Sequence, residues 1–121
     1  MAVLHIATAI DDRYVTPLQV MLASLTARLA VGVETVLHLV HHSLSSESRA
    51  RISELVETRF VAAPPDRASL LSAHSGLPAE AGYLVLFPEL LPALDRVLFL
   101  DADLLVLDDI TPLWQTELGG R

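Results

Sequence analysis

The sequence has no cysteine and no lysine, and only 5% of its residues are aromatic. Without cysteine there can be no disulfides and no thiolate chemistry, which fits a cytoplasmic location. Every basic side chain is an arginine, and the net charge is −7. An acidic chain without a basic stripe is a poor nucleic-acid binder. These absences exclude thiol and lysine-dependent mechanisms, and they argue against nucleic acid as a partner.

Long apolar runs are also absent, although 52% of the residues are hydrophobic. No segment approaches the ~18–20 uninterrupted apolar residues of a membrane span. The first residues, MAVLHIATAIDD, have neither a basic start nor a small-residue cleavage site, so we expect no membrane span and no secretory signal. A length of 121 residues predicts a single domain over residues 1–121 that can bury a core of its own.

Apolar segments alternate with helical patterns along the chain. Strands are predicted at Val3–Ile10, Glu34–Val40, Arg59–Ala63 and from Arg96 onward. This alternation predicts an α/β fold with a doubly wound, mostly parallel, Rossmann-like sheet.

The predicted helices have recognisable start signals. Thr16 followed by proline favours a first helix, and Ser45 favours a second. The buried stripe of the first helix is expected at Leu18, Met21, Leu22, Leu25 and Leu29, with Gly32 as its stop, and that of the second at Ile52, Leu55 and Val56. A third helix is predicted over Pro78–Leu91, and Thr111 with the following proline predicts a last one.

An acidic pair interrupts the apolar sequence RVLFLDADLLVLDD near the end of the chain. Burying carboxylates is costly without compensation, and hard cations take oxygen ligands of this kind. Residues i and i+2 at a strand end point to the same side, so Asp101 and Asp103 can aim at one point. A second pair, Asp11 and Asp12, follows the first strand. If the two strands are neighbours, both pairs line the crevice at the carboxyl ends of the strands, which predicts a metal-diphosphate site.

Each of these residues also has a purely structural interpretation. The first acidic pair suits a turn or a helix cap, and Asp108 with Asp109 is interpreted as a strand end that leads into the last helix. Tyr14 suits stacking on a flat ring and packing at a helix entry equally well. The histidines are expected in the core at His5 and His38 and on the solvated surface at His41 and His42, and Trp114 is expected to be a packing anchor.

A phosphoacceptor receiver domain is an alternative from another class, because it also places an acidic pair after its first strand, with Asp108 here as the acceptor. Such domains need a lysine near the acyl phosphate, and this sequence has none. The separation of Asp12 from Asp108 is also about twice what that fold allows.

Two segments, IATAIDDRYVTPLQVMLASL and LLPALDRVLFLDADLLVLDDITPLWQTEL, resemble glycosyltransferase family 8, which includes glycogenin and bacterial lipopolysaccharide galactosyltransferases. The resemblance runs in order through nearly the whole chain and implies a glycosyltransferase-A fold of which this chain is the nucleotide-binding half. It also implies a retaining transferase that uses a UDP-sugar and Mn²⁺ or Mg²⁺, with an acceptor that the sequence does not identify.

The site residues follow from the same resemblance. Asp101 and Asp103 would be the metal ligands, and the nucleotide would be bound by Ala9, Ile10, Asp11, Arg13, Tyr14, Asp101 and Ala102. No catalytic residue is assigned.

Two departures from the family pattern affect the expected activity. Valine stands at position 85, where the family has an arginine that helps to bind the donor. The family's C-terminal half supplies a third metal ligand and the acceptor site, and these 121 residues are expected to lack both. We therefore expect weak binding of bare metal and little transfer by this chain alone, and a surface that favours self-association. An inactive nucleotide-sugar-binding half-domain, or one subunit of a split enzyme, remains an alternative with the same site residues.

Overall fold

The computed structural model describes residues 2–62 and 94–116, which build a sheet of parallel strands. The strands pair in the order β3-β2-β1-β4, with β1 at Ala2–Ala9, β2 at Val33–His41, β3 at Glu57–Ala62 and β4 at Leu98–Phe99. The predicted parallel α/β fold is confirmed. Order 3-2-1-4 is that of Rossmann-like sheets, whereas receiver domains have the order 2-1-3, so the receiver alternative is wrong.

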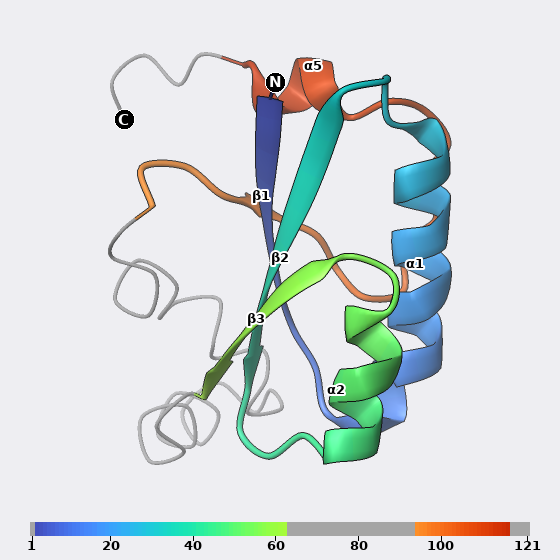
Figure 1. Ribbon diagram of the computed structural model, residues 1–121, viewed down its shortest axis with the longest axis vertical. Helices are drawn as coiled ribbons and strands as arrows, with labels where there is room; N and C mark the ends of the chain where they lie inside the picture. The colour runs from blue at the N-terminus through green and yellow to red at the C-terminus, as the bar shows by residue number, and fades with distance from the viewer. Residues whose placement is uncertain (1, 63–93, 117–121) are drawn as a thin grey trace, which may run out of the picture.

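Helices α1 (Val15–Arg28) and α2 (Ser46–Ser53) lie side by side against one face of the sheet (Figure 1). The predicted stripe of α1 is buried at Leu18, Met21, Leu22 and Leu25. It packs on the side chains of β1 and β2 that point to this face, Ile6, Leu37 and Leu39. Burial of each such side chain contributes about 1.5–3 kcal/mol, so this layer is the main source of stability among the described residues.

The opposite face of the sheet carries His5 of β1 and His38 of β2, because alternate residues of a strand point to opposite faces. His5 Nδ1 and His38 Nε2 are 2.9 Å apart and form a hydrogen bond. The ring of His5 also lies 6.0 Å from that of Trp114 in the short helix α5 (Thr111–Trp114). His38 is thus a buried residue hydrogen-bonded to His5, as predicted, whereas His5 is only half-buried and packs beside Trp114.

The start of the first helix differs from the prediction. A 3₁₀ helix, η1 (Asp12–Tyr14), runs directly into α1, so Tyr14 precedes the helix and Thr16 is not its cap. Pro17 still lies in the first turn, where its missing N–H has no intrahelical partner to lose. The predicted cap of α2 is confirmed, because Ser45 Oγ accepts a hydrogen bond from the Ser48 amide at 3.2 Å.

The second helix is shorter than its apolar pattern suggested. It ends at Ser53, so Leu55 and Val56 lie beyond it. Val56 is buried, whereas Leu55 is 40% exposed. His41 was predicted on the surface but is the last residue of β2 and is buried, whereas His42 is exposed.

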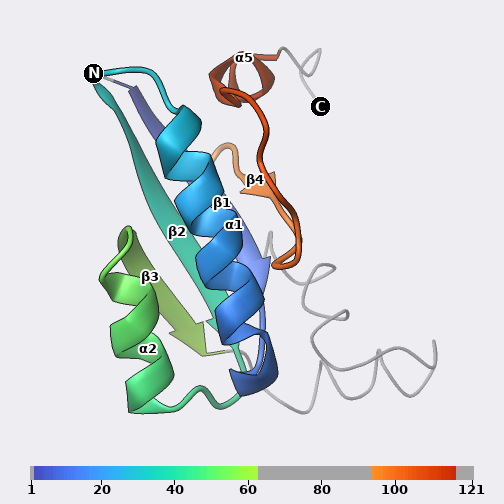
Figure 2. The same cartoon turned by 90° about the vertical axis from the view of Figure 1, so that its right-hand side faces the viewer.

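The fourth strand is the largest correction. Only two residues pair with β1, and the second apolar run lies outside the sheet, with Leu104, Leu105 and Leu107 exposed and Val106 buried. The chain turns at residues 102–103. Asp101 and Asp103 are both exposed there, so their carboxylates avoid the free-energy cost of burial. It then returns along the side of α1 that faces away from α2 and reaches α5 near the start of β1 (Figure 2).

The turn between α1 and β2 lies at the amino edge of the sheet. The helix ends at Arg28, and Gly32 lies in the turn that follows, with a φ of +86° in the left-handed region that favours glycine. The Val33 amide donates to the Ala30 carbonyl at 3.2 Å, and the Val31 side chain is fully exposed. The predicted helix Pro78–Leu91 lies outside the described residues, and no helix in the described part is long and apolar enough to cross a membrane.

Candidate functional site

The two acidic segments leave neighbouring strands at the same edge of the sheet. Ile6 pairs with Leu98 and Ala7 with Phe99, and the Leu100 amide donates to the Ala7 carbonyl at 3.1 Å. The adjacency on which the predicted site depends is therefore present. The strand order reverses at β1, and ligands of open α/β sheets bind at this reversal, outside the carboxyl ends of the strands.

Asp101 and Asp103 flank a buried residue. Ala102 is 8% exposed and belongs to the core, whereas both aspartates are exposed. Neither carboxylate has a hydrogen-bond or ion-pair partner within residues 2–62 and 94–116. No group of three or more histidine, aspartate or glutamate side chains in those ranges could hold a metal ion. The pair therefore offers a cation oxygen ligands of the right kind but only part of a coordination sphere.

Asp11 is engaged by its neighbour Arg13. One carboxylate oxygen accepts from the Arg13 amide at 2.8 Å and the other from the guanidinium Nε at 2.9 Å. The guanidinium holds the pKa of Asp11 below its usual 3.8, so the carboxylate stays charged. The Arg13 side chain is 77% exposed, which places a positive charge at the mouth of the crevice.

Asp12 has a structural role. Its Oδ1 accepts hydrogen bonds from the Ser48 hydroxyl at 2.7 Å, the Ser45 amide at 3.1 Å and the Ser45 hydroxyl at 3.2 Å. These donors belong to the start of α2, and the Ser48 hydroxyl contributes most to lowering the pKa of Asp12. The helix-cap interpretation is correct for Asp11, whose side chain caps η1 by accepting from the Arg13 amide, whereas Asp12 bonds Ser45 and Ser48 at the start of α2.

The remaining predicted nucleotide residues line the same loop. Ala9 ends β1, and Ile10 is 2% exposed within the core, so Ile10 can offer a ligand only its backbone. The ring of Tyr14 is 45% exposed, and the guanidinium carbon of Arg13 lies 6.0 Å from its centroid. An exposed ring beside a cation is suited to stacking on a flat anionic ligand.

The turn at 101–103 is attached to β1 on the side of Leu100 and to α1 on the side of Val106. The Val106 amide donates to Ser24 Oγ at 2.9 Å, and that hydroxyl donates in turn to the Met21 carbonyl at 2.7 Å. Farther along, Asp109 Oδ1 accepts from the Thr111 amide at 2.9 Å and from its hydroxyl at 2.6 Å. Asp109 is therefore structural, as predicted, whereas nothing in the sequence pattern singled out Ser24.

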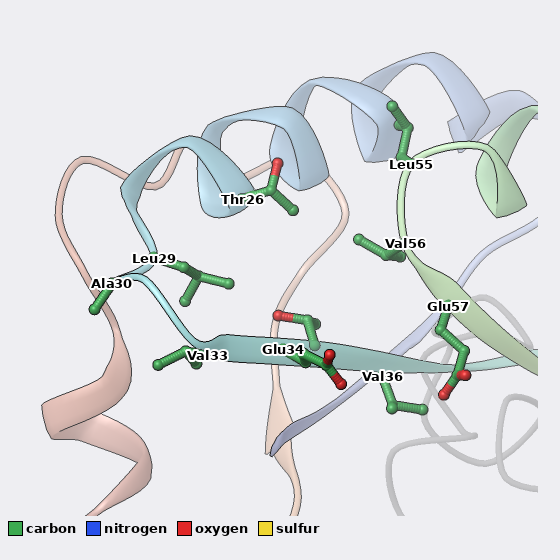
Figure 3. A pocket seen from close by; sticks show the side chains of 10 residues that line it. Thr26, Leu29, Ala30, Val33, Glu34, Val36, Leu55, Val56 and Glu57 are labelled. Atoms are coloured by element: carbon green, nitrogen blue, oxygen red, sulfur yellow. The ribbon is translucent and has the colours of Figure 1, made fainter. Parts of the chain in front are cut away.

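A groove of about 450 Å³ lies at the opposite, amino edge of the sheet (Figure 3). It is bordered by the end of α1, the start of β2 and the segment after α2, including Leu29, Val56 and the buried hydroxyl of Thr35. No residue of the predicted site lines it. The groove lies at the amino ends of the strands, whereas the two acidic segments follow the carboxyl ends of β1 and β4. The groove is therefore distinct from the crevice at the carboxyl edge.

Comparison with known proteins first identifies the class of fold. The galactosyltransferase LgtC, crystallised with donor and acceptor sugar analogs, superposes with a TM-score of 0.80 at 27% identity over 98% of this chain and 44% of LgtC. The structure is thus a glycosyltransferase-A type sheet, as the resemblance implied.

The family follows from the sequence comparisons. The family model described as glycosyl transferase family 8 matches residues 5–121, and the chain belongs to that family. General stress protein A of Bacillus subtilis (strain 168) is 24% identical over 97% of this chain and 43% of its own length. Probable galacturonosyltransferase-like 9 of Arabidopsis thaliana is 27% identical over 98% of this chain and 34% of its own. The chain thus spans less than half the length of these relatives.

Proposed function

We propose that this chain binds a nucleotide-sugar, in the first place a UDP-sugar, through a divalent cation held by Asp101 and Asp103, for retaining glycosyl transfer. The observation that carries the proposal is the pairing of β1 with β4 at the point where the strand order reverses. This pairing leaves the exposed carboxylates of one strand beside the loop of the other. Membership of glycosyl transferase family 8 supports the same conclusion.

The carboxylates of Asp101 and Asp103, which have no partner among the described residues, suit Mn²⁺ or Mg²⁺, because hard cations prefer oxygen ligands. A bound ion would stabilise the charge that develops on a diphosphate leaving group as a Lewis acid. Two carboxylates leave most of an octahedral sphere to water and to the diphosphate. Bare metal should therefore bind weakly, and nucleotide and metal should bind together.

The loop after β1 would hold the nucleoside. Ala9 and Ile10 offer backbone groups, Tyr14 offers an exposed ring for the base, and Arg13 offers a positive charge. To contact a ligand with its guanidinium, Arg13 would have to give up bonds to Asp11, or the two residues would have to bind as a unit. Either arrangement predicts that both side chains change their environment when nucleotide binds.

Calorimetric titration with UDP, with and without Mn²⁺, tests the proposal. We expect UDP to bind measurably only when Mn²⁺ is present, and Mn²⁺ to bind at least about tenfold more weakly when UDP is absent. Tight binding of bare Mn²⁺, or equal binding of UDP with and without metal, would contradict the proposed site.

The alternative, a nucleotide-sugar-binding domain without catalysis, shares every site residue. The valine at position 85, in place of the family's arginine, favours it. Incubation with a UDP-sugar and Mn²⁺ separates the two functions, because a transferase releases UDP in the presence of an acceptor or of water, whereas a binding domain does not.

A further inference from the structure

The turn that carries Asp101 and Asp103 has little support from the sheet. Strand β4 contributes only Leu98 and Phe99 to the pairing with β1, and one further amide bond follows at Leu100. Beyond that point the segment is held by two buried side chains, Ala102 and Val106, which pack in the core. Among the described residues, the contacts that hold its position beyond Leu100 are therefore those with α1 and the core.

One side chain of α1 makes a hydrogen bond to this segment. Ser24 Oγ accepts from the Val106 amide at 2.9 Å and donates to the Met21 carbonyl at 2.7 Å. The hydroxyl thus has a partner on each side, and its proton is committed to the helix. Because the hydroxyl donates to the helix, its lone pairs are available to accept from the Val106 amide. This hydrogen bond joins two residues that are 82 positions apart in the sequence.

We propose that Ser24 is a positioning residue for the metal site. Through the Val106 amide it fixes the turn so that both carboxylates stay on the outer side of buried Ala102. The proposal rests on the proposed function, because it assigns to Ser24 the task of preorganising Asp101 and Asp103. Without this bond the Val106 amide is half-buried and unpaired, which favours states of the segment in which that amide reaches water.

The expected consequence is a loss of binding rather than of fold. If Ser24→Ala lowers the fraction of molecules with the turn in its binding geometry, the apparent affinity falls in proportion to that fraction. We expect UDP affinity in the presence of Mn²⁺ to fall about tenfold, the equivalent of one lost buried hydrogen bond. Ser24→Thr keeps a hydroxyl and should restore most of the affinity.

Thr26 provides the matched control on the same helix. Its hydroxyl donates to the Leu22 and Ala23 carbonyls, at 3.0 and 3.2 Å, and makes no hydrogen bond to the described segment after β4. Thr26→Val removes that hydroxyl with almost no change in volume. It should leave UDP affinity unchanged, so that any loss specific to Ser24→Ala cannot be attributed to a general loss of helix stability.

Amide hydrogen exchange, thermal unfolding and calorimetry with UDP and Mn²⁺ together test the proposal. We expect Ser24→Ala to accelerate exchange at Val106, to unfold near the temperature of Thr26→Val, and to bind UDP about tenfold more weakly. If exchange at Val106 accelerates while UDP affinity stays at the wild-type value, Ser24 holds the segment without positioning the site, and the proposal is wrong. If the wild-type chain binds no UDP, the proposed function fails with it, and the exchange data still show whether Ser24 anchors the segment.

Discussion

The two acidic pairs at the carboxyl edge of the sheet look alike in the sequence and are used differently by the fold. The carboxylates of Asp11 and Asp12 are both occupied, the first by Arg13 and the second by the start of α2. Those of Asp101 and Asp103 have no partner among the described residues and face solvent. The difference shows that an aspartate whose carboxylate is hydrogen-bonded within the fold contributes to stability. An aspartate without a partner among the described residues is available to a ligand. Each of the following predictions tests this division.

The largest effect is expected from the unpaired carboxylates. Asp101→Asn or Asp103→Asn should weaken UDP binding in the presence of Mn²⁺ by at least about 100-fold, more than the loss of an outer-shell partner usually costs. Thermal unfolding should change little, because neither side chain makes a contact that stabilises the described fold. Asp108→Asn is a suitable control, since Asp108 is exposed and bonds only the next amide. A large drop in Tm with unchanged binding would reverse the roles of the two pairs.

Asp12→Ala should have the opposite signature. The substitution removes the acceptor of three hydrogen bonds at the start of α2, so we expect the Tm to fall by several degrees. Nucleotide affinity of the folded protein should stay near the wild-type value. Asp12→Asn retains an acceptor oxygen and should recover much of the loss. Nucleotide affinity that falls as far as in Asp101→Asn would place Asp12 in the binding site instead.

Acid titration should separate the carboxylates from the histidines of β2. Burial lowers the pKa of His38 and of His41 below 6.5, helped in His38 by the charges of His5 and Arg59. Because the unfolded chain takes up these protons first, the stability they contribute is complete above about pH 6.5 and is lost as the pH falls through the folded-state pKa. The Asp11 and Asp12 contributions should be complete above their unfolded-state pKa of 3.8 and be lost as the pH falls from there through their lowered folded-state pKa.

The measurement is the Tm at about pH 7.5 and about pH 5.5, an interval in which histidines are the side chains that mainly change charge. His41→Leu should reduce the difference between the two Tm values, because it removes one of the groups that titrate. The substitution should cost no hydrogen bond at Nδ1, since that buried atom has no partner among the described residues. His42→Gln, at an exposed position, is the control. If the difference in Tm between the two pH values is as large in His41→Leu as in the wild type, His41 does not contribute to the pH dependence of stability.

The smallest effect on stability is expected beside the unpaired carboxylates, at Leu105 and Leu107, which are 62% and 72% exposed. Substitution of either leucine by serine should change the free energy of unfolding by no more than about 0.5 kcal/mol. The sequence led us to expect self-association without assigning it to particular residues. If these two leucines contribute to it, the same substitutions should shift light scattering toward the monomer. Identical scattering before and after substitution would assign any association to another surface.

The sequence sufficed to predict the parallel sheet and the position of both acidic pairs. Buried parallel strands are recognisable in a sequence as unbroken apolar runs, and the acidic pairs lie where such runs end. It did not predict that Leu98 and Phe99 would be the whole of the fourth strand, because periodicity cannot distinguish a paired run such as Val97–Leu100 from an unpaired one such as Leu104–Leu107. That choice depends on where the carboxylates must reach water.

Partners in three dimensions were equally hidden. The hydrogen bonds of Asp12 reach Ser45 and Ser48, which are 33 and 36 positions farther along the chain. The bond between Ser24 and Val106 joins residues 82 positions apart. A single hydroxyl on a helix carries no pattern, so Ser24 could be found only once the segment after β4 was placed beside α1. A cap for the following helix was predicted for the first acidic pair and is provided by Asp11, but the bonds of Asp12 to the start of α2 could not be identified from local spacing.

The exposed turn between α1 and β2 has a practical consequence for studying the protein. Since the chain contains no cysteine, Val31→Cys would supply a unique thiol at a fully exposed position at the far edge of the sheet from the acidic pairs. A fluorophore or a surface tether attached there would leave the crevice unobstructed. The same molecule could then be watched singly while nucleotide and metal ions come and go.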